Sequence, residues 1–461
     1  MELLQINWSG VGLMAAQLIL SLSILVVLHE FGHYITAKWF KCRVEKFYLF
    51  FDPWFSIAKK KIGETVYGIG WLPLGGYVKI SGMVDESMDK ESLKLPPQPW
   101  EFRSKPAWQR LIIMLGGVTV NVLLAFVIYA MIMFVWGETK TVNSSVKNGI
   151  WITDSLMYDI GLRNGDKIVS VNDQYIDYFE EIPKKILFSG GNTVKISRNS
   201  KDSTINIPIK IIGDLVERKR SKGLLMIERI PPIVGWFDPR DSSNAKKSGL
   251  QYMDKVLKVD SVPVEFMDDI VAYTTNKKKE QVNLSVLRNG AAVNLTAQVN
   301  ENGRLGIPLL EDKQYDSLGV FKLQITKFGF FESFPKGVSL AITSLKDYIE
   351  QFKLIFKPST GAYKGVGGFK TMGSIFPSDH WDWHAFWAIT AFYSIILAFM
   401  NLLPIPALDG GHVVFTLAEM ITGRKPSDKF LEYAQVVGMV LLLGLMLYAN
   451  GNDWFGWGKG R

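Results

Sequence analysis

Hydrophobic positions gather in four long runs without a charged residue, and polar segments of very different length separate these runs. The runs cover residues 8–28, 111–136, 385–408 and 434–452. Each is close to the roughly 20 residues that an α-helix needs to cross the hydrocarbon of a bilayer. The first run lacks the basic start and small-residue cleavage site of a signal peptide, so we expect it to be retained. The pattern therefore predicts an α-helical membrane protein with four transmembrane helices.

A repeat occupies the long polar segment between the second and third runs. The sequence GLRNGDKI at 161–168 returns as GLQYMDKV at 249–256, and 194–196 returns as 282–284 at the same spacing. Two copies of an α+β module of ordinary domain size fit this pattern. The copies resemble PDZ domains, the first more closely because Met253 replaces the glycine in the second. PDZ domains bind chain ends as an added strand, whereas a bulky filter against large substrates is the alternative. A Gly-Leu-Gly-Phe-type loop is not evident in the sequence, so peptide binding is a hypothesis.

Charge orients the spans. Residues 1–28 contain no Lys or Arg, whereas Lys38, Lys41 and Arg43 follow the first run and Arg424 and Lys425 follow the third. Positive loops stay in the cytoplasm, so both chain ends and residues 137–380 are expected on the opposite side.

The net charge of +8 comes without a basic block interleaved with aromatics, which argues against nucleic-acid binding. Cys42 is the single cysteine, which excludes an intrachain disulfide and a cysteine zinc cluster.

The end of the first run carries an H-E-x-x-H sequence, His29-Glu30-Phe31-Gly32-His33. On a helix, residues four apart share a face, so His29 and His33 can bind one metal ion. Glu30 lies beside that face, where it can accept a proton from the attacking water. Ionisable residues at this membrane depth are costly unless they are functional, and a metal removes that cost. Two imidazoles leave a tetrahedral zinc short of a protein ligand, so a third must come from elsewhere.

The end of the third run offers that ligand. Pro404 and Pro406 interrupt the helix, and such a backbone is tolerated in a membrane only inside protein or beside water. Asp409 follows as the expected carboxylate ligand, and the next two glycines permit a tight bend. His412 competes as a ligand, and an ordinary interfacial loop is the alternative.

His29-Glu30-Phe31-Gly32-His33 together with Asn401-x-x-Pro-x-Pro-x-Leu-Asp409-Gly resembles the site-2 protease family of intramembrane zinc metalloproteases. The resemblance implies that His29, His33 and Asp409 hold Zn²⁺ and that Glu30 activates water. It also implies that Asn401 helps to hold the substrate strand, with Pro404 in the same substrate-binding motif. The sequence departs from the family at Val118, where a proline is usual in the second span, while Gly116, Gly117 and Asn121 remain. These three are consistent with close helix packing and an interhelical hydrogen bond.

Residues 66–80 resemble the membrane-associated β element of that family. A Gly-rich strand at Gly75 and Gly76 with a free edge could pair with an unfolding substrate helix by β-augmentation. A small sheet resting on the bilayer is the alternative.

Further along the chain, residues 339–356 could form an amphipathic helix on the outer membrane surface. His380 and His384 are also four apart, but they lack the adjacent Glu and are read as interfacial.

The expected fold class is a polytopic α-helical membrane protein with a small membrane-associated β element and two inserted α+β PDZ-like domains. The expected segments are listed here: 1–36 (first span with H-E-x-x-H), 37–106 (cytoplasmic β region), 107–136 (second span), 137–222 and 223–312 (periplasmic PDZ-like domains), 313–380 (amphipathic surface segment), 381–423 (third span) and 424–461 (cytoplasmic loop and fourth span).

The resemblance implies a protease of the bacterial inner membrane, with its active site near the cytoplasmic side. Its substrates would be single-span anti-sigma factors already trimmed outside, or remnant signal peptides. A metal-ion transporter would also place His and Asp in spans, but it would not need Glu30. A membrane scaffold working through its PDZ-like copies is the third possibility.

Overall fold

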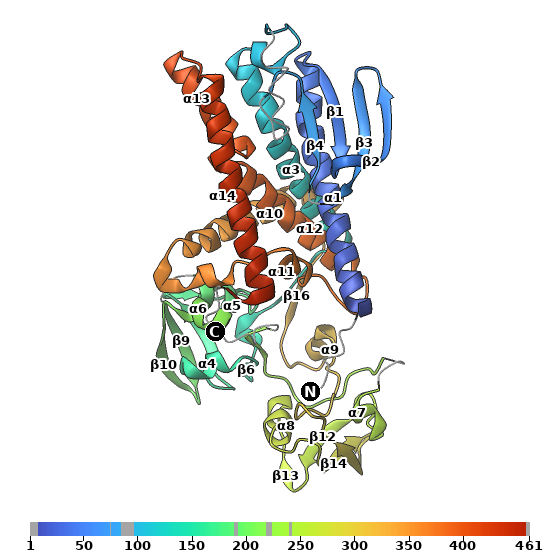
Figure 1. Cartoon of the computed structure of the whole chain (residues 1–461). Coiled ribbons are helices and arrows are strands. Elements are labelled where there is room, and N and C mark those ends of the chain that lie inside the picture. Colours follow the sequence, from blue (N-terminus) through green and yellow to red (C-terminus); the bar gives the residue numbers. More distant parts are fainter. Residues whose placement is uncertain are drawn as a thin grey trace. The chain divides into compact units, whose positions relative to one another are not determined.

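The computed structural model describes residues 8–73, 75–83, 96–188, 192–217, 224–238 and 242–457. The chain divides into two compact units (Figure 1). The first unit comprises Met1–Gly137, Lys327–Lys353 and Val366–Arg461. The second comprises Glu138–Thr326 and Leu354–Gly365. Each unit has its own architecture and is described separately.

Long apolar helices build the first unit. Among the described residues, four helices are long and apolar enough to cross a membrane: α1 (Trp8–Trp39), α3 (Ala107–Val135), α12 (Trp383–Asn401) and α14 (Asp428–Phe455). They contain most of the four predicted runs, so the expectation of four apolar helices is confirmed. The unit also contains η1 (Phe102–Ser104), α10 (Phe330–Ile355, whose last residues belong to the second unit), α11 (Phe369–Gly373) and α13 (Asp409–Thr422).

Two helices differ from their predicted extent. The amphipathic helix expected at 339–356 begins at Phe330 and continues through Pro335. A proline in the second turn removes one backbone hydrogen bond, and aromatic packing offsets that loss because Phe134 stacks edge-to-face on Phe330 at 5.8 Å. The helix of the third run is shorter than the run, since α12 ends at Asn401 and the next helix, α13, begins at Asp409, just after the run.

A four-stranded sheet follows α1 in the chain. Its strands are β1 (Val44–Leu49), β2 (Phe51–Ile62), β3 (Thr65–Leu72) and β4 (Tyr77–Ile80), in the spatial order β2-β3-β1-β4. β1 pairs in parallel with β3 and antiparallel with β4, which leaves β4 at one edge. The prediction that Gly75 and Gly76 lie within a strand is wrong: both precede β4 in the connection from β3. Gly75 has a φ of 156°, a value that L-residues with a side chain rarely adopt.

The second unit consists of short strands and helices. Two four-stranded sheets have the orders β10-β9-β7-β8 and β13-β12-β14-β15, and the pairs β11-β6 and β16-β5 complete the described strands. The strands are β5 (Glu138–Thr141), β6 (Ile150–Ile152), β7 (Lys167–Val171), β8 (Gln174–Tyr175), β9 (Asn192–Arg198), β10 (Lys201–Ile207), β11 (Met226–Glu228), β12 (Lys255–Val259), β13 (Val262–Pro263), β14 (Gln281–Arg288), β15 (Ala291–Gln298) and β16 (Leu323–Thr326). The helices are η2 (Asn143–Ser145), α4 (Ser155–Asp159), α5 (Glu181–Phe188), α6 (Ile211–Glu217), α7 (Asn244–Lys247), α8 (Met267–Thr274), α9 (Asp312–Ser317), η3 (Pro358–Thr360) and η4 (Ala362–Gly365).

The sequence repeat is also a structural repeat. The two Asp-Lys sequences lead into β7 and β12, which occupy equivalent positions in the two larger sheets. Asp166 is fully buried and pairs with Arg198 at 2.7 Å, while Asp254, 1 % exposed, pairs with Arg288 at 2.6 Å. In both copies the arginine also donates to a glycine carbonyl at 2.8 Å, that of Gly161 in the first copy and that of Gly249 in the second. The same set of contacts therefore occurs at the same place in both modules.

Strand β11 lies beyond residue 222, where the sequence suggested that the second copy begins. It nevertheless pairs antiparallel with β6 of the first copy, with Ile227 opposite Trp151. A single cluster of buried apolar side chains continues through both copies. The two modules therefore share one core.

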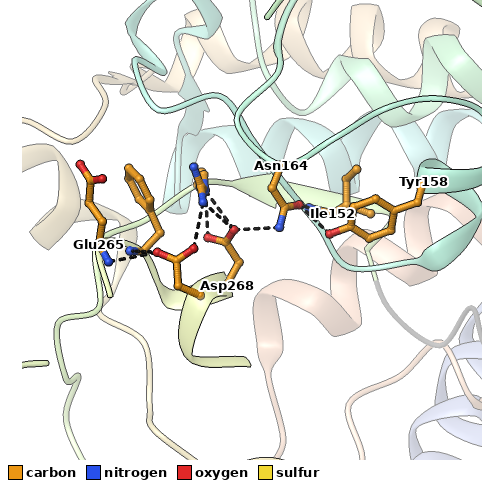
Figure 2. A network of polar contacts seen from close by, with 8 residues as sticks. Ile152, Tyr158, Asn164, Glu265 and Asp268 are labelled. Atoms are coloured by element: carbon orange, nitrogen blue, oxygen red, sulfur yellow. Dashed lines mark hydrogen bonds and ion pairs between the residues drawn. The ribbon is translucent and has the colours of Figure 1, made fainter. Parts of the chain in front are cut away.

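Polar contacts link the two copies as well (Figure 2). Asn164, in the first copy, donates from Nδ2 to Asp268 at the start of α8 over 2.7 Å. Its Oδ1 accepts from the backbone N–H of Ile152 at 2.8 Å and from the Tyr158 hydroxyl at 2.9 Å. Arg229, in the connection between the copies, donates from Nε to both carboxylate oxygens of Asp268 at 3.0 Å. Asp268 is 4 % exposed, so this buried carboxylate is neutralised by a residue of the connecting segment.

Candidate metal centre

The two histidines of the H-E-x-x-H sequence project from the same face of α1. His29 and His33 are both buried, with their rings edge-to-face and 4.9 Å between centroids. Their Nε2 atoms are 3.3 Å apart. This is the arrangement that the four-residue spacing predicts on a helix.

Asp409 reaches the same point from the start of α13. One of its carboxylate oxygens, Oδ2, lies 3.2 Å from Nε2 of His29 and 3.2 Å from Nε2 of His33. One ligand atom from each of the three residues lies within 4.8 Å of the other two. The carboxylate occupies the first turn of its helix, where the helix dipole favours negative charge.

The segment between α12 and α13 places Asp409 by folding tightly. A Cβ on Gly410 would lie 2.3 Å from the Leu403 carbonyl oxygen, and one on Gly411 would lie 2.4 Å from Cα of Pro406. Both positions therefore exclude a side chain. Pro404 lies in this non-helical segment, as the sequence predicts.

The outer ring nitrogens of both histidines have partners on α3. Nδ1 of His33 lies 2.8 Å from the Ile113 carbonyl oxygen, which can only accept, so this nitrogen carries the proton and Nε2 keeps its lone pair. Nδ1 of His29 lies 3.1 Å from Nδ2 of Asn121, whose Oδ1 is buried without a hydrogen-bond partner. Turning this amide by 180° would let Oδ1 accept a hydrogen bond from Nδ1–H of His29. Nε2 of His29 would then keep its lone pair, as Nε2 of His33 does.

The donor set fits a metal ion. Two imidazole nitrogens, on rings whose outer nitrogens contact α3, and one carboxylate oxygen are typical of a catalytic zinc site with three protein ligands. Asp409 Oδ2 is buried and has no hydrogen-bond partner, a costly state for a carboxylate oxygen unless a cation satisfies it.

Glu30 lies between the metal centre and the edge strand of the sheet. Its carboxylate accepts a hydrogen bond from the backbone of Val78 in β4. A Cβ on Gly76 would lie 3.4 Å from Cγ of Glu30 and 2.7 Å from the Tyr48 carbonyl oxygen. Gly76 therefore lets the start of β4 approach the glutamate. On the other side of the centre, Nδ2 of Asn401 lies 3.3 Å from Nε2 of His29.

Glycines bring α1 and α3 into backbone contact beside the centre. A Cβ on Gly32 would lie 2.3 Å from the Gly116 carbonyl oxygen. A Cβ on Gly117 would lie 2.4 Å from Nε2 of His33 and 2.6 Å from Cε1 of His29. α3 continues as one helix through Val118, where a proline is usual in the family that the sequence resembles.

Other candidate groups lie elsewhere. His412 does not belong to the three-residue metal cluster and lines a separate hollow with Arg110 and Glu419. His384 packs edge-to-face on Trp136 at 5.3 Å, and His380 lies 3.0 Å from an Asp379 oxygen. Cys42 is buried, and burial raises the pKa of its thiol, which does not favour a nucleophile.

Sequence reasoning missed three supports of the centre. They are the Ile113 carbonyl, the Val78 backbone and the ion pair of Arg110 with Glu419 at 2.5 Å, which links α3 to α13. The two backbone groups leave no signal in side-chain identity. An arginine near the start of one apolar run and a glutamate shortly after another are the only sequence signals of the ion pair.

An H-E-x-x-H helix whose histidines meet a distant aspartate inside a bundle of apolar helices defines a membrane metalloprotease. The model of peptidase family M50 matches residues 17–445, and the chain belongs to this family, the site-2 proteases. It is therefore a zinc metalloprotease and an integral membrane protein, and the expectations of a protease and of zinc are confirmed.

Similar proteins occur in several bacteria. The chain is 25 % identical over 450 residues to a candidate zinc metalloprotease of Treponema pallidum, covering 94 % of this chain and 96 % of that one. It is 28 % identical over 443 residues to one of Campylobacter jejuni, covering 94 % and 91 %. It is 26 % identical over 468 residues to the regulator of sigma E protease of Haemophilus influenzae, covering 94 % and 97 %.

Proposed function

We propose that the protein cleaves transmembrane segments of single-span membrane proteins in regulated intramembrane proteolysis. Substrates of the anti-sigma-factor type are suggested by the similarity to a regulator of sigma E protease, and remnant signal peptides are a second class. The single observation that carries the proposal is the convergence of His29, His33 and Asp409 beside Glu30 within apolar helices. Hydrolysis at such a site is useful only for a bond that lies within or near the membrane.

In this proposal His29, His33 and Asp409 hold the zinc ion, with Ile113 and Asn121 orienting the imidazoles. Zinc, when bound, supplies a Lewis acid that polarises a carbonyl and lowers the pKa of water. Glu30 accepts the proton of the attacking water and then donates it to the leaving amine. The backbone of Val78 orients the Glu30 carboxylate for both transfers.

A substrate helix hides its backbone, so it must become extended before cleavage. The free edge of β4 offers backbone groups to an added strand. Gly76 adds no side chain beside Glu30, and Gly75 adds none beside the Phe51 ring. Asn401, beside His29, holds the other side of the strand, and Pro404 keeps the following segment out of a helix.

We further propose that the H-E-x-x-H end of α1 faces the cytoplasm of a bacterial inner membrane. The two repeat copies would then be periplasmic PDZ-like domains that bind substrate ends or exclude bulky substrates. Basic residues that flank the spans support this orientation. The repeated Asp–Arg pairs and the equivalent strand orders of the two larger sheets support two modules of one type.

The test combines zinc content with cleavage of a labelled transmembrane helix in detergent. Glu30→Gln is expected to keep zinc and to lower cleavage about 10²–10⁴-fold, the usual contribution of a general base. Asp409→Asn is expected to lose both zinc and cleavage. His33→Ala should do the same, whereas the control His384→Ala, from the other pair with the same spacing, should retain both.

The same experiment separates the rival functions. Zinc transport or scaffolding through the repeat copies would survive Glu30→Gln. Full zinc binding with equal cleavage by wild type and Glu30→Gln would reject the role of Glu30. A wild-type protein without zinc would reject the mechanism as a whole.

A further inference from the structure

The sheet that follows α1 has two chemically different faces. Cross-strand neighbours point to the same side of a sheet, so its register assigns each residue to a face. Phe47, Tyr67 and Lys60 form one row, and this face is turned to α1, because Tyr34 of α1 stacks edge-to-face on Phe47 at 5.6 Å. The Tyr34 and Tyr67 hydroxyls are also 2.7 Å apart.

Lysines occupy the other face. Lys46 and Lys61 both pair with Val66, and Lys59 pairs with Gly68 in a second row. Lys46, Lys59 and Lys61 line one hollow of this face, and we refer to these three residues as the lysine face. The Tyr48 ring, 2 % exposed, lies over Gly68, where a Cβ would come within 2.3 Å of it. The aromatic ring of Tyr48 therefore lies at the bottom of the hollow that the lysines line.

The carboxylate at this hollow is already engaged. Asp52 accepts from the Tyr77 hydroxyl at 2.8 Å and from Ser56 Oγ at 3.0 Å. Lys46 donates to the Tyr77 hydroxyl at 3.3 Å. Among the described residues, no carboxylate forms an ion pair with Lys46, Lys59 or Lys61. The hollow consequently holds more positive charge than its surroundings neutralise.

Lys79 is the counter-example on the same side of the sheet. It pairs with Lys46 across β1 and β4, but its Nζ lies 3.3 Å from a Glu45 oxygen. Its charge is therefore neutralised within the protein. Of the lysines on this face that the structure describes, Lys46, Lys59 and Lys61 have no such carboxylate partner.

The other end of β2 is apolar and uncovered. Trp54 is 91 % exposed, Phe55 59 % and Ile57 65 %. Trp54 and Phe55 each stack on Trp71 of β3, at 6.1 and 5.8 Å. An exposed aromatic end followed along the same strand by lysines is the pattern of a segment at a membrane surface, with rings among acyl chains and cations among phosphates.

We propose that the lysine face binds the headgroup phosphate of an anionic glycerophospholipid whose acyl chains cover Trp54 and Phe55. Ammonium groups on one side of a hollow suit a phosphate, and the aromatic end suits the attached chains. A free phosphate would leave the aromatic end uncovered, so the lipid is the favoured source. The bound lipid would fix the depth of the sheet, and with it the position of β4 beside Glu30.

Native mass spectrometry of the full-length protein in detergent tests the proposal, with phosphatidylglycerol or phosphatidylcholine added at equal concentration. Wild type is expected to retain phosphatidylglycerol preferentially. Lys59→Gln and Lys61→Gln should each lower that retention about fivefold, as expected for one lysine near an anionic surface. Lys60→Gln is the matched control, because it removes the same charge from the same strand on the opposite face.

Further variants and a soluble competitor distinguish a specific lipid-binding site from nonspecific electrostatic attraction. Lys59→Arg with Lys61→Arg should retain the lipid, and zinc content should stay at the wild-type level in every variant. Free sn-glycerol 3-phosphate should not displace the lipid. An equal loss in Lys60→Gln, equal retention of phosphatidylcholine, or displacement by glycerol phosphate would overturn the proposal.

Discussion

Asn121 on α3 and His29 on α1 meet side chain to side chain, with 3.1 Å between the amide Nδ2 and the imidazole Nδ1. The backbone oxygen of Asn121 accepts in turn from Ser394 Oγ at 2.7 Å, so the contact extends to α12. One asparagine thereby connects His29 of the candidate metal centre to two other helices. Its side chain is fully buried, and the ring orientation of His29 depends on it.

We expect Asn121→Leu to weaken zinc binding about 10–100-fold, because His29 loses the group that fixes its tautomer and orientation. Competition with a chromogenic chelator measures this affinity. Asn121→Asp keeps an oxygen acceptor and should stay closer to wild type. Unchanged zinc affinity in the leucine variant would contradict a positioning role.

Gly117→Ala is expected to abolish zinc binding without unfolding the protein. The added Cβ would lie 2.4 Å from Nε2 of His33, where a methyl group and a metal-binding nitrogen cannot coexist. Gly12→Ala is the control, because no atom lies within 4 Å of a Cβ there. Zinc content and helical circular dichroism should separate the two variants. Normal zinc content in Gly117→Ala would mean that the α1–α3 contact is looser than described.

Asp268→Ala should loosen the two repeat copies from each other. The change leaves the partly buried Arg229 without its main carboxylate, and breaking such a pair costs about 3 kcal/mol. Hydrogen exchange of the full chain should show faster exchange in α8 and in the connection around Arg229. Asp173→Asn removes the exposed partner of Lys195 and should change exchange little. Equal effects of both changes would contradict the idea that the contacts of Asp268 with Asn164 and Arg229 hold the two copies together.

Glu228 and Asp312 should each oppose the folding of the second unit less as the pH falls below neutral. Burial, with the nearby Asp312 and Glu180 carboxylates, raises the pKa of Glu228, and burial together with Glu180 raises that of Asp312. A raised folded-state pKa means that ionisation opposes folding above that pKa. The penalty disappears as the pH falls through the folded-state pKa toward the ordinary carboxyl value.

Glu228→Gln is therefore expected to stabilise the unit at pH 7 and to flatten this pH dependence. Glu217→Gln is the control, and its expected effect on stability at pH 7 is opposite. Hydrogen bonding to Lys364 lowers the pKa of Glu217. The ionised Glu217 therefore stabilises the unit at neutral pH, and this stabilisation is lost in acid. Pulse proteolysis in urea across pH 4–8 measures both. A destabilising Glu228→Gln at pH 7 would contradict the assignment.

The sequence predicted those parts that depend on local pattern or on side-chain chemistry. Uncharged runs gave the membrane helices, and the spacing of His29 and His33 gave a shared helical face. The two prolines before Asp409 indicated a break at the end of the third run. Each of these signals lies within a few residues of the structure that it determines.

Features that depend on long-range backbone contacts were beyond the same reasoning. The strand at Gly75 and Gly76 was expected from the resemblance of residues 66–80 to the family's β element, yet both residues precede β4, where a Cβ on Gly76 would lie 2.7 Å from the Tyr48 carbonyl oxygen. The Ile113 carbonyl supports His33 whatever side chain residue 113 carries. The start of α10 at Phe330 lies before the expected 339–356, and an aromatic contact with Phe134 of α3 supports this first turn.

The glycine contact between α1 and α3 holds together the helix that carries the two histidines and the helix that supports them. With Gly32 and Gly116 in backbone contact, these two helices cannot part without losing the geometry of both histidines. By contrast, 11 % of the apolar stretch of α14 is buried, and Gly438 brings it close to the segment at Ala407. Most of the apolar stretch of α14 is therefore exposed, whereas α1 and α3 are held by backbone contact beside both histidines.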